Sequence, residues 1–129
     1  MEIPFEARMP GTPLGVRMLR HEMSILAADC GMDTAGVADV RLAVTEAATN
    51  AVMHGYGEAT GELTVSAHVQ DGELAIVITD TGRGFDERRE SPGLGVGLSI
   101  IAIVADRLRI VTTPHGTEIH MAFPCSNGH

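Results

Sequence analysis

The chain of 129 residues has no lysine, and all nine of its cationic side chains are arginine. This absence excludes the standard P-loop and the strand motif of ordinary protein kinases, because both place a lysine on phosphate. Aromatic residues make up only 3% of the chain, and the formal net charge is −8. With few rings to stack on bases and an excess of carboxylates, we expect no direct nucleic-acid partner.

Cysteine and long apolar runs are also scarce. Cys30 and Cys125 show no metal-ligand spacing, which favours a reducing compartment. The longest apolar run, Ile100 to Ala105, is far short of the roughly 20 residues that cross a membrane, and the N-terminal residues do not resemble a signal peptide. We therefore expect a cytoplasmic protein without a membrane span, folded as a single domain over residues 1–129.

Hydrophobic periodicity predicts five strands and three helices. Alternating apolar and polar residues predict strands at 3–9, 62–69, 73–80, 107–113 and 117–123. Helical spacing predicts helices from Pro13 to Cys30, at 35–55 and at 96–106. The third is nearly all apolar, which predicts that it is buried. Together these elements indicate an α/β two-layer sandwich, with a mixed, mostly antiparallel sheet and the helices on one face.

A carboxylate ends the strand expected at 73–80. Leu74, Ile76, Ile78 and Asp80 share one side of it, because alternate side chains of a strand point to the same face. Asp80 therefore faces the core, where an unmatched carboxylate costs on the order of several kcal/mol. Two interpretations stay open: a buried aspartate that is satisfied beside a turn, or an aspartate at the floor of a ligand pocket.

The helix expected at 35–55 carries polar residues beside its apolar stripe. Glu46, Asn50 and His54 are four residues apart, so at 3.6 residues per turn they form a ladder along the border of the buried face. An ordinary surface face is the alternative interpretation. The ladder has a chemical role only if a ligand fills a cleft between this helix and the strand that ends at Asp80.

The third polar feature is the glycine-rich segment Gly93-Leu94-Gly95-Val96-Gly97, where the last helix is expected to begin. Free backbone N–H groups and the helix dipole suit phosphate at such a place. Asn50 offers a neutral oxygen to Mg²⁺, which prefers oxygen ligands. Asp80 accepts hydrogen bonds only and can select the exocyclic amine of adenine. Together these residues predict a Mg-ATP site.

Four short motifs within 37–123 resemble those of the Bergerat ATP-binding fold, which defines the GHKL superfamily. Residues 46–50, EAATN, resemble its N box, residues 80–84, DTGRG, its G1 box, and residues 93–98, GLGVGL, its G2 box. Gly116-Thr117 is similar to the late Gly-Thr pair of the adenine pocket. The run 44–56, VTEAATNAVMHGY, most resembles the anti-sigma-factor serine/threonine kinases.

This resemblance implies a role for each matched position. Glu46 would be the general base toward a serine or threonine hydroxyl, Asn50 would hold Mg²⁺, and Asp80 would bind the adenine amine with help from Thr117. The other positions would shape the pocket or face the phosphates: Gly82, Gly84, Gly93, Gly95, Val96 and Gly97. The family further implies an ATP-dependent kinase, working as a homodimer, that phosphorylates an anti-sigma antagonist and sequesters a sigma factor.

The segment between the glycine clusters, Phe85 to Pro92, is short for a lid over nucleotide. Arg88 or Arg89 within it could reach the outer phosphates or could simply be solvated. Three hypotheses follow. The first is the kinase just described, the second is a nucleotide-binding partner-switch module without phosphotransfer, and the third is an interaction domain whose pocket has decayed.

Overall fold

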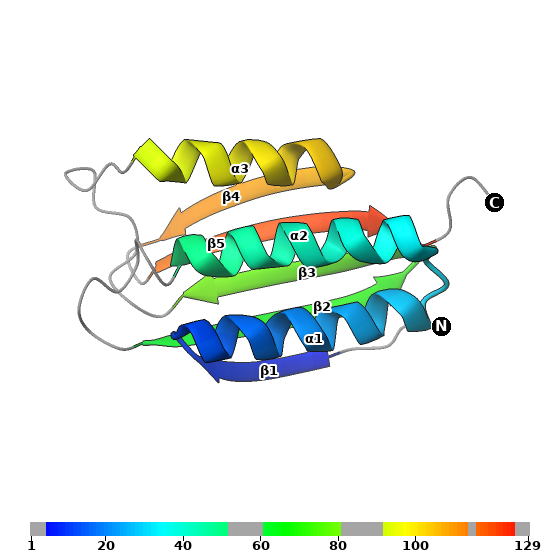
Figure 1. The fold of residues 1–129 in the computed structure, drawn as a ribbon, viewed down its shortest axis with the longest axis horizontal. Coiled ribbons are helices and arrows are strands. Elements are labelled where there is room, and N and C mark those ends of the chain that lie inside the picture. The colour runs from blue at the N-terminus through cyan, green and yellow to red at the C-terminus, as the bar shows by residue number, and fades with distance from the viewer. Residues whose placement is uncertain (1–4, 52–60, 81–91, 114–115, 126–129) are drawn as a thin grey trace.

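A computed structural model of the chain describes residues 5–51, 61–80, 92–113 and 116–125. Eight elements follow one another along it (Figure 1). In chain order they are β1 (Phe5–Pro10), α1 (Pro13–Asp29), α2 (Thr34–Asn50), β2 (Glu62–Gln70), β3 (Glu73–Asp80), α3 (Pro92–Val104), β4 (Arg107–Thr113) and β5 (Gly116–Pro124). The number, type and order of the elements are those that the periodicity predicts.

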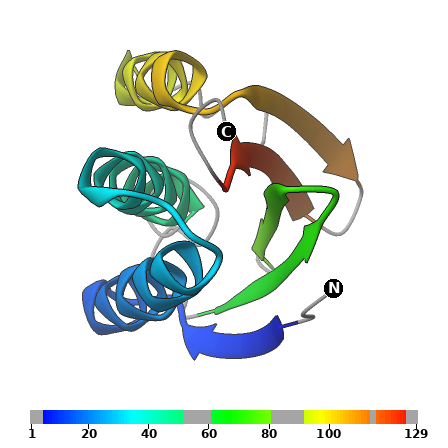
Figure 2. The same ribbon diagram turned by 90° about the vertical axis from the view of Figure 1, so that its right-hand side faces the viewer.

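The five strands form one sheet in the order β1-β2-β3-β5-β4, and each neighbouring pair is antiparallel. All three helices lie on the same face of this sheet, as Figures 1 and 2 show. The opposite face carries the alternate residues of each strand. This arrangement confirms the predicted two-layer α/β sandwich with the helices on one face, although the described strands pair antiparallel throughout, so the sheet is not mixed.

The turn between β2 and β3 is the two-residue hairpin turn that Asp71-Gly72 favours. The φ angles of these residues are 55° and 75°, which is the left-handed region required at both central positions of a type I′ turn. Gln70 and Glu73 are cross-strand partners on either side of it. This turn fixes the register of β2 against β3 and therefore the face to which each of their side chains points.

Local hydrogen bonds determine where the first two helices begin. The side chain of Thr12 accepts a hydrogen bond from the backbone N–H of Gly15, and that of Asp33 accepts one from Gly36. Both residues are N-caps, which satisfy backbone donors that a helix start leaves open. The predicted extension of α2 from residue 52 to residue 55 lies outside the described residues.

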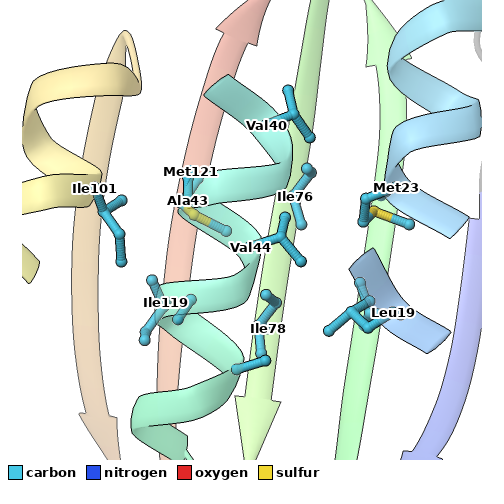
Figure 3. Packing of buried hydrophobic residues seen from close by; sticks show 14 of the residues in the cluster. Leu19, Met23, Val40, Ala43, Val44, Ile76, Ile78, Ile101, Ile119 and Met121 are labelled. Atoms are coloured by element: carbon cyan, nitrogen blue, oxygen red, sulfur yellow. The ribbon is translucent and has the colours of Figure 1, made fainter. Parts of the chain in front are cut away.

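The core lies between the helices and the covered face of the sheet (Figure 3). Val40, Ala43 and Val44 of α2 are fully buried above Ile76 and Ile78 of β3. The small side chains of α2 bring this helix close to the sheet, and α2 contacts both α1 and α3. The central helix is therefore held on three sides, which positions its C-terminal end.

The third helix differs from its prediction in two ways. It begins at Pro92 rather than at residue 96, so the glycine-rich segment forms its first turns. Proline suits this start because its fixed φ is helical and the first N–H needs no helical partner. The helix is also not buried all round: Ile101 is fully buried, whereas Ile103 is 81% exposed. Only one face of α3 meets α2 and the sheet, because this helix lies at the edge of the helical layer (Figure 2).

None of the described helices is long and apolar enough to cross a membrane.

Candidate functional site

Three polar side chains are buried among the described residues, and all three are predicted site residues. Asn50, Asp80 and Thr117 are only 5%, 3% and 3% exposed. Such side chains are rarely buried unless hydrogen-bond partners compensate for the lost water. Their burial therefore requires a structural or a functional reason.

The register of the sheet brings Asp80 and Thr117 together. Ile78 is the cross-strand partner of Ile119, and Thr79 is that of Glu118. Continuing this antiparallel register by one residue places Thr117 opposite Asp80. Both side chains lie on the helix-covered face, one step beyond the buried isoleucine pair, because alternate residues share a face. The carboxylate of Asp80 and the hydroxyl of Thr117 therefore lie on neighbouring strands at the end of the apolar core.

Asn50 is the last residue of α2 and lies at the same end of the molecule. This helix runs in the same direction as β3, with Val44 above the stretch between Ile76 and Ile78 (Figure 3). From Val44, Asn50 lies about 9 Å further along the helix, and from Ile78, Asp80 lies about 7 Å further along the strand. The end of α2, the end of β3 and the start of α3 lie at one end of the fold (Figure 1).

Two atoms of this group have no hydrogen-bond partner in the described structure. They are the amide nitrogen Nδ2 of Asn50 and the hydroxyl oxygen Oγ1 of Thr117. Leaving a buried polar group unmatched costs about 1–3 kcal/mol. Both atoms could regain hydrogen bonds if a polar ligand entered between α2 and the ends of β3 and β5. The unmatched donor and acceptor groups at this end of the core are therefore typical of a ligand-binding site and not of a core closed by apolar side chains.

Glu46 lies one helical turn before Asn50 on α2. Side chains at i and i+4 of a helix lie on the same face. Glu46 is half-buried, whereas Ala47 and Ala48 beside it are fully buried. Its carboxylate thus stands at the border of the buried face, which confirms the predicted ladder for its first two members. His54, the third member, lies outside the described residues.

The glycines of the predicted site divide into two groups. Gly82 and Gly84, together with Arg88 and Arg89, fall outside the described residues. The other matched positions, the glycines Gly93, Gly95 and Gly97 with Val96 between them, belong to the first turns of α3. The N–H groups at the start of a helix have no intrahelical partners, so they are available to an anion.

A separate hollow of about 610 Å³ lies on the open face of the sheet. His68, Val77, Arg109 and His120 are among its lining residues, and none of the predicted site residues is. The described side chains there include no buried polar atom without a partner. The unmatched polar atoms distinguish the end of the core from this hollow on the open face of the sheet.

The sequence analysis assigns Thr117 to the site only through the family resemblance, although the alternation of apolar residues in the same strand also indicates that Thr117 is buried. Thr117 precedes Ile119, Met121 and Phe123 by two, four and six residues, so it shares their buried face. The same parity argument that places Asp80 in the core thus applies to Thr117. Sequence alone does not show that β5 pairs with β3, and the opposition of the two residues depends on that pairing.

The sequence of this chain is similar to a family of ATPase domains and to individual anti-sigma factors and protein kinases. Residues 9–123 match the histidine kinase-like ATPase domain. An anti-sigma F factor from Pasteuria penetrans is 36% identical over 97 residues, which cover 64% of this chain and 65% of that protein. The serine-protein kinase RsbW of Bacillus licheniformis is 36% identical over 91 residues, covering 70% of this chain and 57% of that protein. The chain thus spans less than two thirds of the length of these relatives.

Solved structures of similar fold are also known. The structure of the RsbU and RsbW domains of Rv1364c from Mycobacterium tuberculosis matches 95% of this chain and 32% of that one, with a TM-score of 0.75 and 25% identity. The histidine kinase domain of the blue-light activated kinase from Erythrobacter litoralis EL346 matches 83% of this chain and 61% of that one, with a TM-score of 0.61. At 21% identity, this second likeness concerns the fold alone.

Proposed function

Because the chain belongs to the histidine kinase-like ATPase family, we propose that it is an ATP-dependent serine/threonine protein kinase and anti-sigma regulatory factor. It would phosphorylate a small anti-sigma antagonist and sequester a sigma factor. The relatives named anti-sigma F factor and serine-protein kinase RsbW support this proposal. The observation that carries it is the group of buried polar side chains, Asn50, Asp80 and Thr117, two of which have unmatched atoms.

The pair Asp80 and Thr117 fits the edge of an adenine base. An ionised carboxylate accepts hydrogen bonds and a hydroxyl both donates and accepts them. Adenine presents an exocyclic amine beside a ring nitrogen, so it can donate to Asp80 and accept from Thr117. Guanine presents a carbonyl oxygen at the place of that amine and would be repelled by the carboxylate. The pocket floor that Gly82 and Gly84 would shape completes this proposal for the base.

Asn50 and the start of α3 would hold the triphosphate. The side-chain oxygen of Asn50 is a ligand type that Mg²⁺ accepts, together with phosphate oxygens and water. The unmatched Nδ2 of the same side chain needs an acceptor, which a phosphate oxygen provides. Gly93, Gly95, Val96 and Gly97 would line the phosphate site from the first turns of α3, where the N–H groups of the first turn, that of Gly93 among them, have no intrahelical partner and would be offered to the phosphates. Bound Mg²⁺ would neutralise charge that develops on the transferred phosphoryl group.

Glu46 would act as the general base. Glu46 is half-buried one turn from Asn50, and from there its carboxylate would reach both the site and a substrate hydroxyl arriving from solvent. It would take the proton of a serine or threonine hydroxyl as that oxygen bonds to the γ-phosphorus, while the bond to the β-phosphate oxygen breaks and ADP leaves. A positioned base of this kind contributes about 10²–10⁴-fold to the rate.

A second candidate function is a nucleotide-binding partner switch that transfers no phosphate. The observation that favours it is the short connection between β3 and α3, which comprises residues 81–91. A connection of this length leaves little chain to close over the phosphates and exclude water. For either function we also propose a cytoplasmic location and a homodimer, and sedimentation of the full chain with and without Mg-ATP would test the dimer.

Phosphotransfer and binding measurements separate the two candidates. Isothermal titration calorimetry with Mg-ATP measures binding, and transfer of labelled γ-phosphate to a candidate antagonist measures the kinase reaction. The kinase proposal expects transfer by the wild type and by the control Glu22→Gln on α1, and transfer at least a hundredfold slower by Glu46→Gln. Binding without transfer to any true antagonist would favour the partner switch. Absence of ATP binding would overturn both.

A further inference from the structure

The open face of the sheet carries the hollow of about 610 Å³, and short side chains form its floor. All three helices lie on the other face (Figure 2). Ala75 of β3 and Ala122 of β5 are cross-strand partners at the middle of the hollow. Val77 lies two residues further along β3 and therefore points to the same face. These three residues make the centre of the hollow apolar and shallow in side chain.

Longer side chains border this floor on both sides. His68 of β2 is the cross-strand partner of Ala75 and borders the floor on one side. Arg107 and Arg109 of β4 border it on the other, with His120 of β5 opposite Arg109. Three strand spacings, about 14 Å, separate β2 from β4. The hollow is therefore a trough with an apolar floor and basic or imidazole side chains along its borders.

The charges around the hollow favour an anionic ligand. Among the described residues that line it, four are arginines or histidines and none carries a carboxylate. Two of the four already have acidic partners: Arg107 donates to Glu73, and His120 lies 2.9 Å from Glu118. Arg109 is exposed and forms no ion pair with a described carboxylate. Its guanidinium group is therefore available to an anion, and a carboxylate can accept two parallel hydrogen bonds from it.

The size and the floor of the hollow indicate what else this ligand must carry. A volume of about 610 Å³ lies within the range of small-molecule sites, which combine mostly apolar walls with a few polar groups. None of the described lining residues is phenylalanine, tyrosine or tryptophan, so a nucleobase would find no ring of these types to stack against. An inorganic anion would leave the apolar floor uncovered. An aliphatic chain with a carboxylate at one end matches both the floor and the charge.

We propose that this hollow binds a medium-chain aliphatic carboxylate. The carboxylate would pair with Arg109, and the chain would lie over Ala75, Val77 and Ala122 toward His68. Apolar contact with the floor would supply affinity, and the guanidinium group would fix the orientation of the ligand. The hollow lies on the opposite face of the sheet from the buried polar site. The proposal therefore does not depend on the proposed function, and we expect the carboxylate to bind with or without nucleotide.

The test titrates the full chain with decanoate in a calorimeter, below the concentration at which micelles form. Decyltrimethylammonium, which has the same chain and a cationic end, is the matched control ligand. We expect decanoate to bind the wild type with saturation, and the cationic twin to bind at least tenfold more weakly. Arg109→Glu should weaken decanoate binding at least tenfold. Arg8→Glu, which reverses an exposed charge on the same face at the opposite edge strand β1, should leave it within twofold of the wild type.

A second pair of variants tests the shape of the hollow. Ala75→Phe places a large side chain on the floor and should weaken decanoate binding at least tenfold. Thr64→Phe makes a change of similar size on β2, on the same face but outside the hollow, and should leave binding within twofold. Both positions are half-buried strand positions, where an aromatic residue is well tolerated. In the unmodified protein, decanoate should shift amide resonances of β3, β4 and β5, which keeps the test independent of how the variants fold.

Each result supports or overturns the carboxylate proposal. Equal binding of the cationic twin, equal weakening by Arg8→Glu, or resonance shifts centred on the helices would overturn it. Absence of decanoate binding to the wild type overturns it as well. If Ala75→Phe then also changes sedimentation from dimer to monomer, the open face is an interface between two copies of the chain. Failure of ATP to bind would affect only the proposed function.

Discussion

The hydroxyl of Thr117 should lower the stability of the nucleotide-free protein and contribute to nucleotide binding. Thr117→Val is therefore expected to change these two properties in opposite directions. Valine has the shape of threonine and suits a strand equally well, so the substitution removes the hydroxyl without creating a cavity. At 3% exposure the hydroxyl is hidden from water, and it has no hydrogen-bond partner in the described structure.

The size of both effects follows from this burial. A buried polar group without a partner costs about 1–3 kcal/mol, so the variant should gain at least about 1 kcal/mol of unfolding free energy without ligand. For a domain of this size that gain raises Tm by at least about 3 °C. With nucleotide, the variant loses one neutral hydrogen bond of about 0.5–1.5 kcal/mol. The free protein gains at least about 1 kcal/mol and the complex loses at least about 0.5 kcal/mol, and both changes weaken binding, so ATP should bind at least about tenfold more weakly.

Thermal unfolding with and without Mg-ATP, together with calorimetric titration, measures both quantities on the same samples. Thr112→Val is the matched control, because Thr112 is the cross-strand partner of Thr117 on β4 but is exposed. It should leave stability within about 0.5 kcal/mol and ATP affinity unchanged. A Thr117→Val protein that is less stable without ligand, or that binds ATP as tightly as the wild type, would refute the reasoning.

Substitutions elsewhere and a change of pH should each have a distinct effect. Asp80→Asn should weaken ATP binding at least tenfold in calorimetry, because an amide N–H₂ would oppose the adenine amine. Glu46→Gln should slow phosphotransfer about 10²–10⁴-fold in the labelled-phosphate assay while ATP affinity stays within twofold. Gly15→Ala should cost at least about 2 kcal/mol in urea unfolding, because the new Cβ would overlap the carbonyl oxygen of Pro10. Burial raises the pKa of the Cys30 thiol from 9.0 to about 12. The stability that this thiol contributes is therefore complete below pH 9 and is lost as the pH rises toward 12, as urea unfolding from pH 8 to pH 11 should show.

Matched control variants distinguish these specific effects from a general loss of folding stability. Asp71→Asn makes the same chemical change at a turn position whose positive φ suits asparagine, so ATP affinity should not change. Gly36→Ala lies in the first turn of α2, where the nearest side-chain atoms are 3.1 Å or more from the new Cβ, and it should be close to neutral. Cys30→Ser should flatten the alkaline decline. A Gly15→Ala protein as stable as the wild type, or an unchanged decline in Cys30→Ser, would contradict the corresponding prediction.

Local sequence patterns determined most of the fold. The hairpin turn at Asp71-Gly72, the strands at 73–80 and 107–113, and the caps of α1 and α2 depend on residues close together in the chain. Alternation within one strand was likewise enough to place Asp80 in the core. Such features follow from the sequence because backbone dihedrals, side-chain parity and capping act over a few residues.

Only the tertiary structure decided which of these elements meet. The pairing of β5 with β3 sets Thr117 opposite Asp80, and the direction of α2 along β3 brings Asn50 to the same end. The start of α3 and the exposure of Ile103 differ from their predictions because they depend on which face of that helix a neighbour covers. The hollow that Arg17 and Arg20 of α1 line together with Arg41 of α2 exists only because these two helices lie side by side. These contacts join distant parts of the chain through packing and burial, and no local pattern in the sequence specifies them.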